Sequence, residues 1–157
     1  LEPKECDKMI VAYKQAYVNT SPCVLYEGVE ALLKRLKDSG KYLAIATGKS
    51  RAGLERALQE TGIKSYFLST KTPDECFAKP HPQMLETICL EWGIETHEAV
   101  MIGDALCDMQ MAKQINMPGI AVMTGSVSKD ALLEAGAVSV NWIKAEGILL
   151  LLGFFIF

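Results

Sequence analysis

The fold is decided by the stretch YLAIATGKS at residues 42–50. Residues 42–46 are short and nearly all apolar, without the alternation of a half-buried strand, which is typical of a strand buried on both faces. Residues 47–50 then form a turn, and apolar residues at helical spacing follow until Gly62. The stretch therefore predicts one strand–turn–helix unit of a layered α/β protein.

A helix precedes this stretch, and strands and helices alternate after it. We expect a helix over about 28–39 before it. Three further helices are expected after it: one beginning near Pro82, one through Met109 to Ile115 and one over 129–135. The predicted strands lie at 66–70, 99–102, 119–123 and 137–140, and short helices are expected over about 4–19 and from Lys144. Strands and helices alternate, which predicts a doubly wound, mostly parallel sheet with helices on both faces.

Composition narrows the class of protein. The chain has 157 residues, is 50% apolar and 22% charged, and carries a net charge of −3 without a basic stripe. One globular domain is expected, with no affinity for nucleic acid or an anionic membrane. Five cysteines without a CxxC motif indicate reduced thiols in a cytoplasmic protein.

The long apolar run, residues 148–157, is too short to cross a bilayer, which needs roughly 20 residues. We interpret it as a final core helix or strand rather than a membrane contact.

Ligands of parallel α/β sheets bind beyond the carboxyl ends of the strands. The residues to inspect are therefore Thr47, the loop over 71–81, Asp104 and Thr124. The loop is unusually long for a compact domain, which favours a functional role.

Asp104 follows a predicted buried strand, and Asp108 lies four residues later in the first turn of a helix. At that spacing both carboxylates can face one point, and their repulsion is relieved by a hard cation such as Mg2+. The alternative is purely structural: Asp104 caps the helix and Asp108 is favoured by the helix dipole.

Thr47 and Gly48 combine a hydroxyl, a glycine and the amides of a helix start, an arrangement that can accept a phosphate. The segment is not a P-loop, because that motif needs a glycine five positions before Gly48 and Leu43 stands there. A capping role for Thr47 is the competing interpretation.

Lys79 stands before Pro80, which restricts its backbone, and a lysine held in this loop could neutralise a phosphate and a nearby carboxylate. The alternative is an ordinary solvated lysine. His81 and His97 form no metal pattern, and we expect structural roles for both.

Together, Thr47, Lys79 and the Asp104–Asp108 pair follow three successive strands, and in this the chain resembles the haloacid dehalogenase-like phosphatases, most closely the phosphoglycolate-phosphatase branch. The resemblance runs from about Pro22 to Ile143. It implies that Thr47 and Gly48 bind the phosphoryl group, that Lys79 stabilises its charge and that Asp104 and Asp108 hold Mg2+. Residues 1–21 resemble the last helix of the family's helical cap, and 22–157 its core.

The chain departs from the family in one respect. Family members attack phosphate with an aspartate at the end of their first core strand, in a DxDxT-type motif that we do not find. That strand lies between those predicted here at 42–46 and 99–102, so we expect the chain to be an N-terminally incomplete piece of a longer protein. Two alternatives are that another segment fills the slot, or that the flanking strands pair directly.

The resemblance implies an Mg2+-dependent phosphatase for small phosphorylated metabolites, acting through a phospho-aspartyl intermediate in the longer parent, with the 157 residues nearly inactive alone. The alternatives are a non-catalytic binding module and a phosphomutase of the same fold. Neither the substrate nor the oligomeric state follows from the sequence.

Overall fold

A computed structural model of the chain describes residues 5, 6, 8, 9, 12, 23–123, 127–142 and 153–156. Its helices are α2 (Val29–Asp38), α3 (Arg51–Thr61), α4 (Gln83–Trp92), α5 (Leu106–Gln114) and α6 (Lys129–Ala135), with 3-10 turns η1 (Lys64–Tyr66) and η2 (Thr96–Glu98). Its strands are β1 (Leu43–Ala46), β2 (Ser69–Lys71), β3 (Val100–Gly103), β4 (Gly119–Met123), β5 (Ala137–Trp142) and β6 (Gly153–Ile156).

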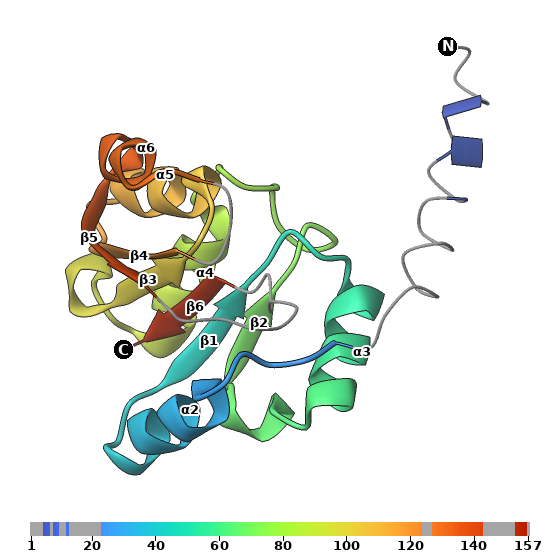
Figure 1. The fold of residues 1–157 in the computed structure, drawn as a ribbon, viewed down its shortest axis with the longest axis horizontal. Helices are drawn as coiled ribbons and strands as arrows, with labels where there is room; N and C mark the ends of the chain where they lie inside the picture. Colours follow the sequence, from blue (N-terminus) through green and yellow to red (C-terminus); the bar gives the residue numbers. More distant parts are fainter. Residues whose placement is uncertain are drawn as a thin grey trace.

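The six strands form one sheet in the order β2-β1-β6-β3-β4-β5 (Figure 1). The pairs β1–β2, β3–β4 and β4–β5 are parallel, whereas β6 runs antiparallel to both of its neighbours. The doubly wound, mostly parallel sheet expected from the sequence is therefore confirmed.

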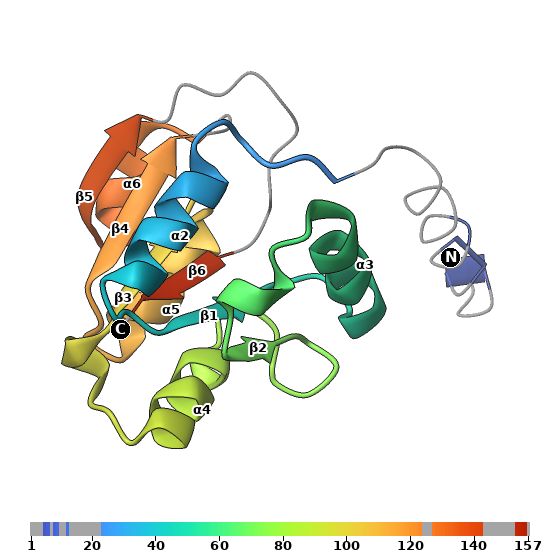
Figure 2. The same cartoon turned by 90° about the horizontal axis from the view of Figure 1, so that it is seen from below.

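Helices cover both faces of the sheet (Figures 1 and 2). Alternation along β1 explains the two cores, because successive side chains of a strand point to opposite faces. Leu43 and Ile45 pack with residues of α2 and α3, while Ala44 and Ala46 pack with residues of α4, α5 and α6. All four residues of β1 are at most 1% exposed, as predicted for a strand buried on both faces.

The slot between β1 and β3 is filled by β6, drawn in dark red in Figure 1. Ala46 of β1 pairs with Gly153, and Leu43 pairs with Ile156. The alternative in which another segment of the chain fills the slot is therefore the one found in the structure. The apolar run near residue 150 thus contributes a core strand, as one of its two interpretations predicted.

The predicted helix ends agree with the backbone. Gly62 and Gly93 follow α3 and α4 in the left-handed conformation, at φ 71° and 65°, which glycine adopts without steric cost. β4 and α6 have the predicted bounds, whereas the strand expected over 66–70 is shorter and later, because residues 64–66 form η1 before β2 begins at Ser69.

Three predictions fall wholly or mostly outside the described residues: the helix over 4–19, the helix from Lys144 and the position of Thr124. Within the described part of the chain, no helix has the length and apolarity needed to span a membrane.

Candidate active site

Two of the predicted site residues lie at the carboxyl edge of the sheet. Thr47 directly follows β1, and Asp104 directly follows β3. Both strands run in the same direction, because β6 is antiparallel to each of them. Thr47 and Asp104 therefore stand at the same edge, separated by the width of β6.

Thr47 is fully buried at the end of β1. Its backbone N–H donates to the Lys71 carbonyl at 3.1 Å, and its hydroxyl oxygen accepts from the Lys49 backbone N–H at 3.1 Å. Helix α3 begins with its own cap, since the Ser50 side chain accepts from the Gly53 N–H. Thr47 is thus not the N-cap of α3, contrary to the competing structural interpretation.

Gly48 adds an accessible stretch of backbone beside Thr47. The residue is exposed, and no atom lies within 4 Å of a Cβ built on it. A ligand can therefore approach this backbone closely, which the predicted phosphate role requires.

Lys79 and Asp108 form a buried ion pair. The Lys79 Nζ lies 2.5 Å from the Asp108 Oδ1, and the two side chains are only 10% and 4% exposed. The other Asp108 oxygen accepts from the Ala105 backbone N–H at 3.2 Å. Lys79 is therefore not the solvated surface lysine of the alternative interpretation, and Asp108 holds it against the start of α5.

Gly103, the last residue of β3, makes room for this pair. A Cβ built on it would lie 2.6 Å from both the Cβ and the Cγ of Asp108, far inside normal contact. The N-cap of α5 is Ala105 rather than Asp104, because Asp108 reaches back to its N–H. The sequence did not reveal this use of Gly103.

The backbone around Lys79 is anchored by two helices. The Lys79–Pro80 peptide is cis, and the Pro80 carbonyl accepts from the Gln114 side chain of α5 at 2.7 Å. The Nδ1 atom of His81 accepts from the backbone N–H of Gln83 at the start of α4. These bonds give His81 the structural role expected and fix the segment that carries Lys79.

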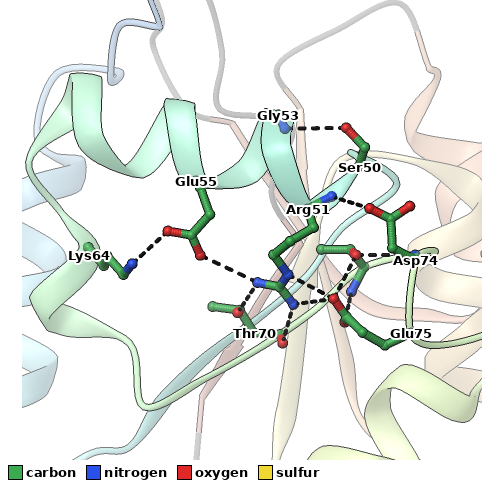
Figure 3. Close-up of polar contacts among 9 residues, drawn as sticks. Ser50, Arg51, Gly53, Glu55, Lys64, Thr70, Asp74 and Glu75 are labelled. Carbon is green, nitrogen blue, oxygen red and sulfur yellow. Dashed lines mark hydrogen bonds and ion pairs between the residues drawn. The ribbon is translucent and has the colours of Figure 1, made fainter.

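A second polar cluster, which the sequence did not reveal, ties the first part of the long loop to α3 (Figure 3). The Arg51 guanidinium lies 2.6 Å from the Glu75 carboxylate and donates to the Thr70 hydroxyl and carbonyl. The Arg51 backbone N–H donates to Asp74 at 2.7 Å. The adjacent acidic residues Asp74 and Glu75 could have indicated an ion pair. Nothing in the local sequence shows which basic side chain they contact.

Asp104 and Asp108, after β3, are the two carboxylates predicted to hold Mg2+. This ion takes one or two carboxylates from a protein and completes its shell with water and phosphate oxygens. Asp104 and Asp108 supply two, and Gly103 leaves the space that Asp108 occupies. Among the described residues, no group of three or more His, Cys, Asp or Glu side chains could hold an ion. Of these two carboxylates, Asp108 already has partners at both of its oxygens, Lys79 and the Ala105 N–H, which an ion at this edge would have to share.

Cys107 is the nucleophilic side chain nearest in sequence to the Asp104 and Asp108 carboxylates. Burial raises the pKa of its thiol, and the Asp108 carboxylate raises it further, although Lys79 opposes the shift. The thiol is therefore protonated at neutral pH, which argues against a thiolate nucleophile.

Comparison with known proteins identifies the family of this chain. The family model described as haloacid dehalogenase-like hydrolase matches residues 1–122. A phosphoglycolate phosphatase of Mesorhizobium japonicum is 32% identical over 129 residues, covering 80% of this chain and 56% of the relative. The pyrophosphatase PpaX of Bacillus pumilus is 33% identical over 137 residues, covering 85% and 63%.

A solved structure shares the fold. The hydrolase from Pseudomonas syringae superposes with a TM-score of 0.79 at 22% identity, covering 89% of this chain and 65% of its own. The chain thus spans a little more than half the length of the two curated relatives above. With its family model matched over most of its length, the chain belongs to the haloacid dehalogenase-like hydrolases.

Proposed function

We propose that the chain is the core of an Mg2+-dependent phosphatase for small phosphate monoesters of the phosphoglycolate type. The observation that carries the proposal is the buried Lys79–Asp108 pair at the sheet edge where Thr47 and Asp104 also stand. The relative named phosphoglycolate phosphatase supports the substrate class.

In this mechanism the chain's residues bind and neutralise the transferring phosphoryl group. The Thr47 hydroxyl and the open backbone at Gly48 bind its oxygens, and the Lys79 ammonium balances their charge while Asp108 keeps it in place. When bound at Asp104 and Asp108, Mg2+ would supply further positive charge to the phosphate oxygens.

The covalent step needs an aspartate from a strand in the slot between β1 and β3. Its carboxylate oxygen attacks phosphorus, the P–O bond to the alcohol breaks, and the alcohol leaves with a proton from a second acid. Water then attacks the phospho-aspartate, releasing phosphate and restoring the carboxylate. Residue Gly153 lies at this end of the slot, so we expect the 157-residue chain to bind phosphate without turning it over.

Binding can be tested without turnover. Inorganic phosphate with Mg2+ should raise the Tm of the chain, and both Thr47→Val and Lys79→Met should weaken this binding at least tenfold. Lys64→Met is the matched control, because Lys64 is exposed, lies past the C-terminal end of α3 away from Thr47, and pairs only with the exposed Glu55 among the ion pairs described. Equal Tm shifts in all four proteins would contradict the proposal.

Turnover is a separate measurement. Phosphate release from 2-phosphoglycolate and from pyrophosphate should be no faster with the chain than with Lys79→Met. A rate typical of family phosphatases would refute the requirement for an aspartate in the slot. Transfer of phosphate to a sugar phosphate instead of water would establish the phosphomutase alternative.

A further inference from the structure

The side chain of Arg51, the first residue of α3, is engaged at every nitrogen (Figure 3). Its Nε atom donates to the Glu75 carboxylate at 2.8 Å, and its two terminal nitrogens donate to the Thr70 hydroxyl at 2.7 Å and the Thr70 carbonyl at 3.0 Å. The terminal nitrogens also lie 2.6 Å from Glu75 and 3.7 Å from Glu55. A ligand could therefore bind the guanidinium only by displacing these partners.

The charge of Arg51 is met inside the same cluster. Glu75 and Glu55 flank the guanidinium, and the Asp74 carboxylate accepts from the Arg51 backbone N–H at 2.7 Å. One guanidinium thus faces two carboxylates, which leaves little positive potential for a phosphate nearby. These contacts argue against Arg51 as the counterion of a substrate and indicate a role in holding other groups.

Arg51 closes the turn that begins at Thr47, and both ends of this turn are attached to one segment. At the first end, the Thr47 backbone N–H donates to the Lys71 carbonyl at 3.1 Å. At the other end, Arg51 is bound to Thr70 and to Asp74. The turn is therefore fixed to the end of β2 and the start of the loop after it.

The geometry inside the turn depends on these attachments. The Lys49 backbone N–H donates to the Thr47 hydroxyl oxygen at 3.1 Å, and the backbone of Gly48 between them is open to a ligand. A movement of the start of α3 against β2 would change both this bond and the direction of the Gly48 N–H. Hydrogen bonds weaken steeply when donor and acceptor are misaligned, so such a movement would weaken phosphate binding.

We propose that Arg51 is a positioning residue: through Thr70 and Glu75 it fixes the turn over 47–50 in the conformation that receives the phosphoryl group, without touching that group. The inference rests on the proposed phosphate-binding role of this turn. An arginine suits the task because its planar fork holds several acceptors at fixed mutual positions, which the single ammonium of a lysine does not do.

The first test needs no ligand. Arg51→Lys keeps the charge without the fork, and Arg51→Met removes both. Hydrogen exchange of the Thr47 and Lys49 amides, followed by NMR, should accelerate by about tenfold in both variants, while amides of β4 and α5 keep their protection. Parent-like exchange in Arg51→Lys would overturn the proposal. If Arg51→Met does not fold, Thr70→Val takes its place, because it removes one acceptor of the fork.

Arg56→Met is the matched control for this test. Arg56 lies on the same helix, its side chain is 32% exposed against 33% for Arg51, and it pairs with Glu60 at 2.5 Å. The loss of an ion pair from α3 is therefore reproduced without a change at the turn. Equal acceleration of the Thr47 and Lys49 amides in Arg56→Met would overturn the proposal.

The second test measures the Kd of inorganic phosphate with Mg2+ by calorimetry. Arg51→Lys and Arg51→Met should each raise the Kd by about tenfold. In a Thr47→Val background, Arg51→Met should raise it by less than about threefold, because both residues act on one turn. Parent-like affinity in Arg51→Lys would show that only the charge matters, and additive effects would show that Arg51 acts elsewhere. Either result would overturn the proposal.

The two proposals fail separately. If the parent does not bind phosphate, but the Thr47 and Lys49 amides exchange faster in both Arg51 variants, the proposed function is wrong and the control of the turn by Arg51 stands. If the parent binds phosphate, and neither the exchange nor the Kd changes in the Arg51 variants, the phosphate site stands and the positioning role is wrong.

Discussion

The ion pair between Lys79 and Asp108 is nearly removed from water, at 10% and 4% side-chain exposure. Burying two charges is costly, and it is tolerated when each charge has further partners. Asp108 has one in the Ala105 N–H, which also ties the pair to the start of α5. The lysine is thereby held at one position. A flexible lysine would lose conformational entropy on binding an anion, and this cost is reduced when the side chain is already fixed.

Removing both partners should cost less than the sum of removing each one alone. We expect Lys79→Met and Asp108→Asn each to lower the free energy of unfolding by about 3 kcal/mol, because the remaining buried charge is left uncompensated. The loss of unfolding free energy in the double variant should be smaller than the sum of the two single losses, by about 1 kcal/mol or more. Urea unfolding of the four proteins measures this, and additive losses would show that the pair does not interact.

Gly103→Ala tests the space occupied by Asp108. The new methyl group would overlap the Asp108 side chain, and we expect a loss of about 1–3 kcal/mol. Gly48→Ala is the matched control, because nothing lies within 4 Å of the added carbon. Its stability should stay within about 0.5 kcal/mol of the parent. A tolerated Gly103→Ala would mean that Asp108 does not sit as described.

At the scale of elements, the loop between β2 and α4 is fastened at both ends. Arg51 and the N-terminus of α3 hold Asp74 and Glu75, and α5 holds the backbone at Pro80. The length of this loop indicated a functional role in the sequence, but the contacts that hold the loop could not be predicted. Arg51 lies 24 positions from Glu75. Pairing over such distances is decided by the fold, not by local spacing. The sequence predicted that Lys79 neutralises a nearby carboxylate, but across 29 residues it could not show that this carboxylate is Asp108.

Acid should weaken this fastening. Burial alone would raise the pKa of Glu75, but hydrogen bonds from Thr72 and Arg51 outweigh it and lower the pKa below its ordinary value of 4.5. Glu75 therefore adds stability above about pH 4.5, and this contribution is lost as the pH falls through the lower pKa of the folded state. The half-exposed pair limits the effect to about 1 kcal/mol or less.

The measurement is the free energy of unfolding at pH 6 and pH 3 for the parent and for Glu75→Gln. The variant should lose less stability on acidification. Glu27→Gln, at an exposed position, controls for the loss of one negative charge. An equal acid response in parent and Glu75→Gln would exclude the proposed linkage.

On the scale of the whole molecule, local sequence was sufficient for most elements. β4 and α6 begin and end as predicted, because apolar spacing and flanking glycines determine both. The strand order around β6 was not predictable, since a short apolar segment can pair with any complementary slot and no local signal gives its direction. The candidate site residues were each named from the sequence, whereas the role of Gly103 depends on packing between β3 and α5.

Cys89 offers a probe of global unfolding. It lies in α4 against the sheet, and burial raises the pKa of its thiol to about 11. At pH 8 roughly one thousandth of it is thiolate, so iodoacetamide should modify Cys89 only after the chain unfolds. The four partly exposed cysteines, Cys6, Cys23, Cys76 and Cys107, should react before it. Mass spectrometry of the labelled protein checks the order, and early labelling of Cys89 would show that α4 opens locally.

The central place of β6 also bears on how the protein is made. The ribosome synthesises β6, residues 153–156, after all the other described strands. In the sheet, β6 lies between β1 and β3, and each of these two strands pairs with β6 along the edge that faces it. Until those residues emerge, β1–β2 and β3–β5 can form only as two separate halves with unpaired apolar edges, which invite chaperone binding. The two halves can therefore join only after residues 153–156 have been made, and nascent chains halted before Gly153 should be retained by chaperones.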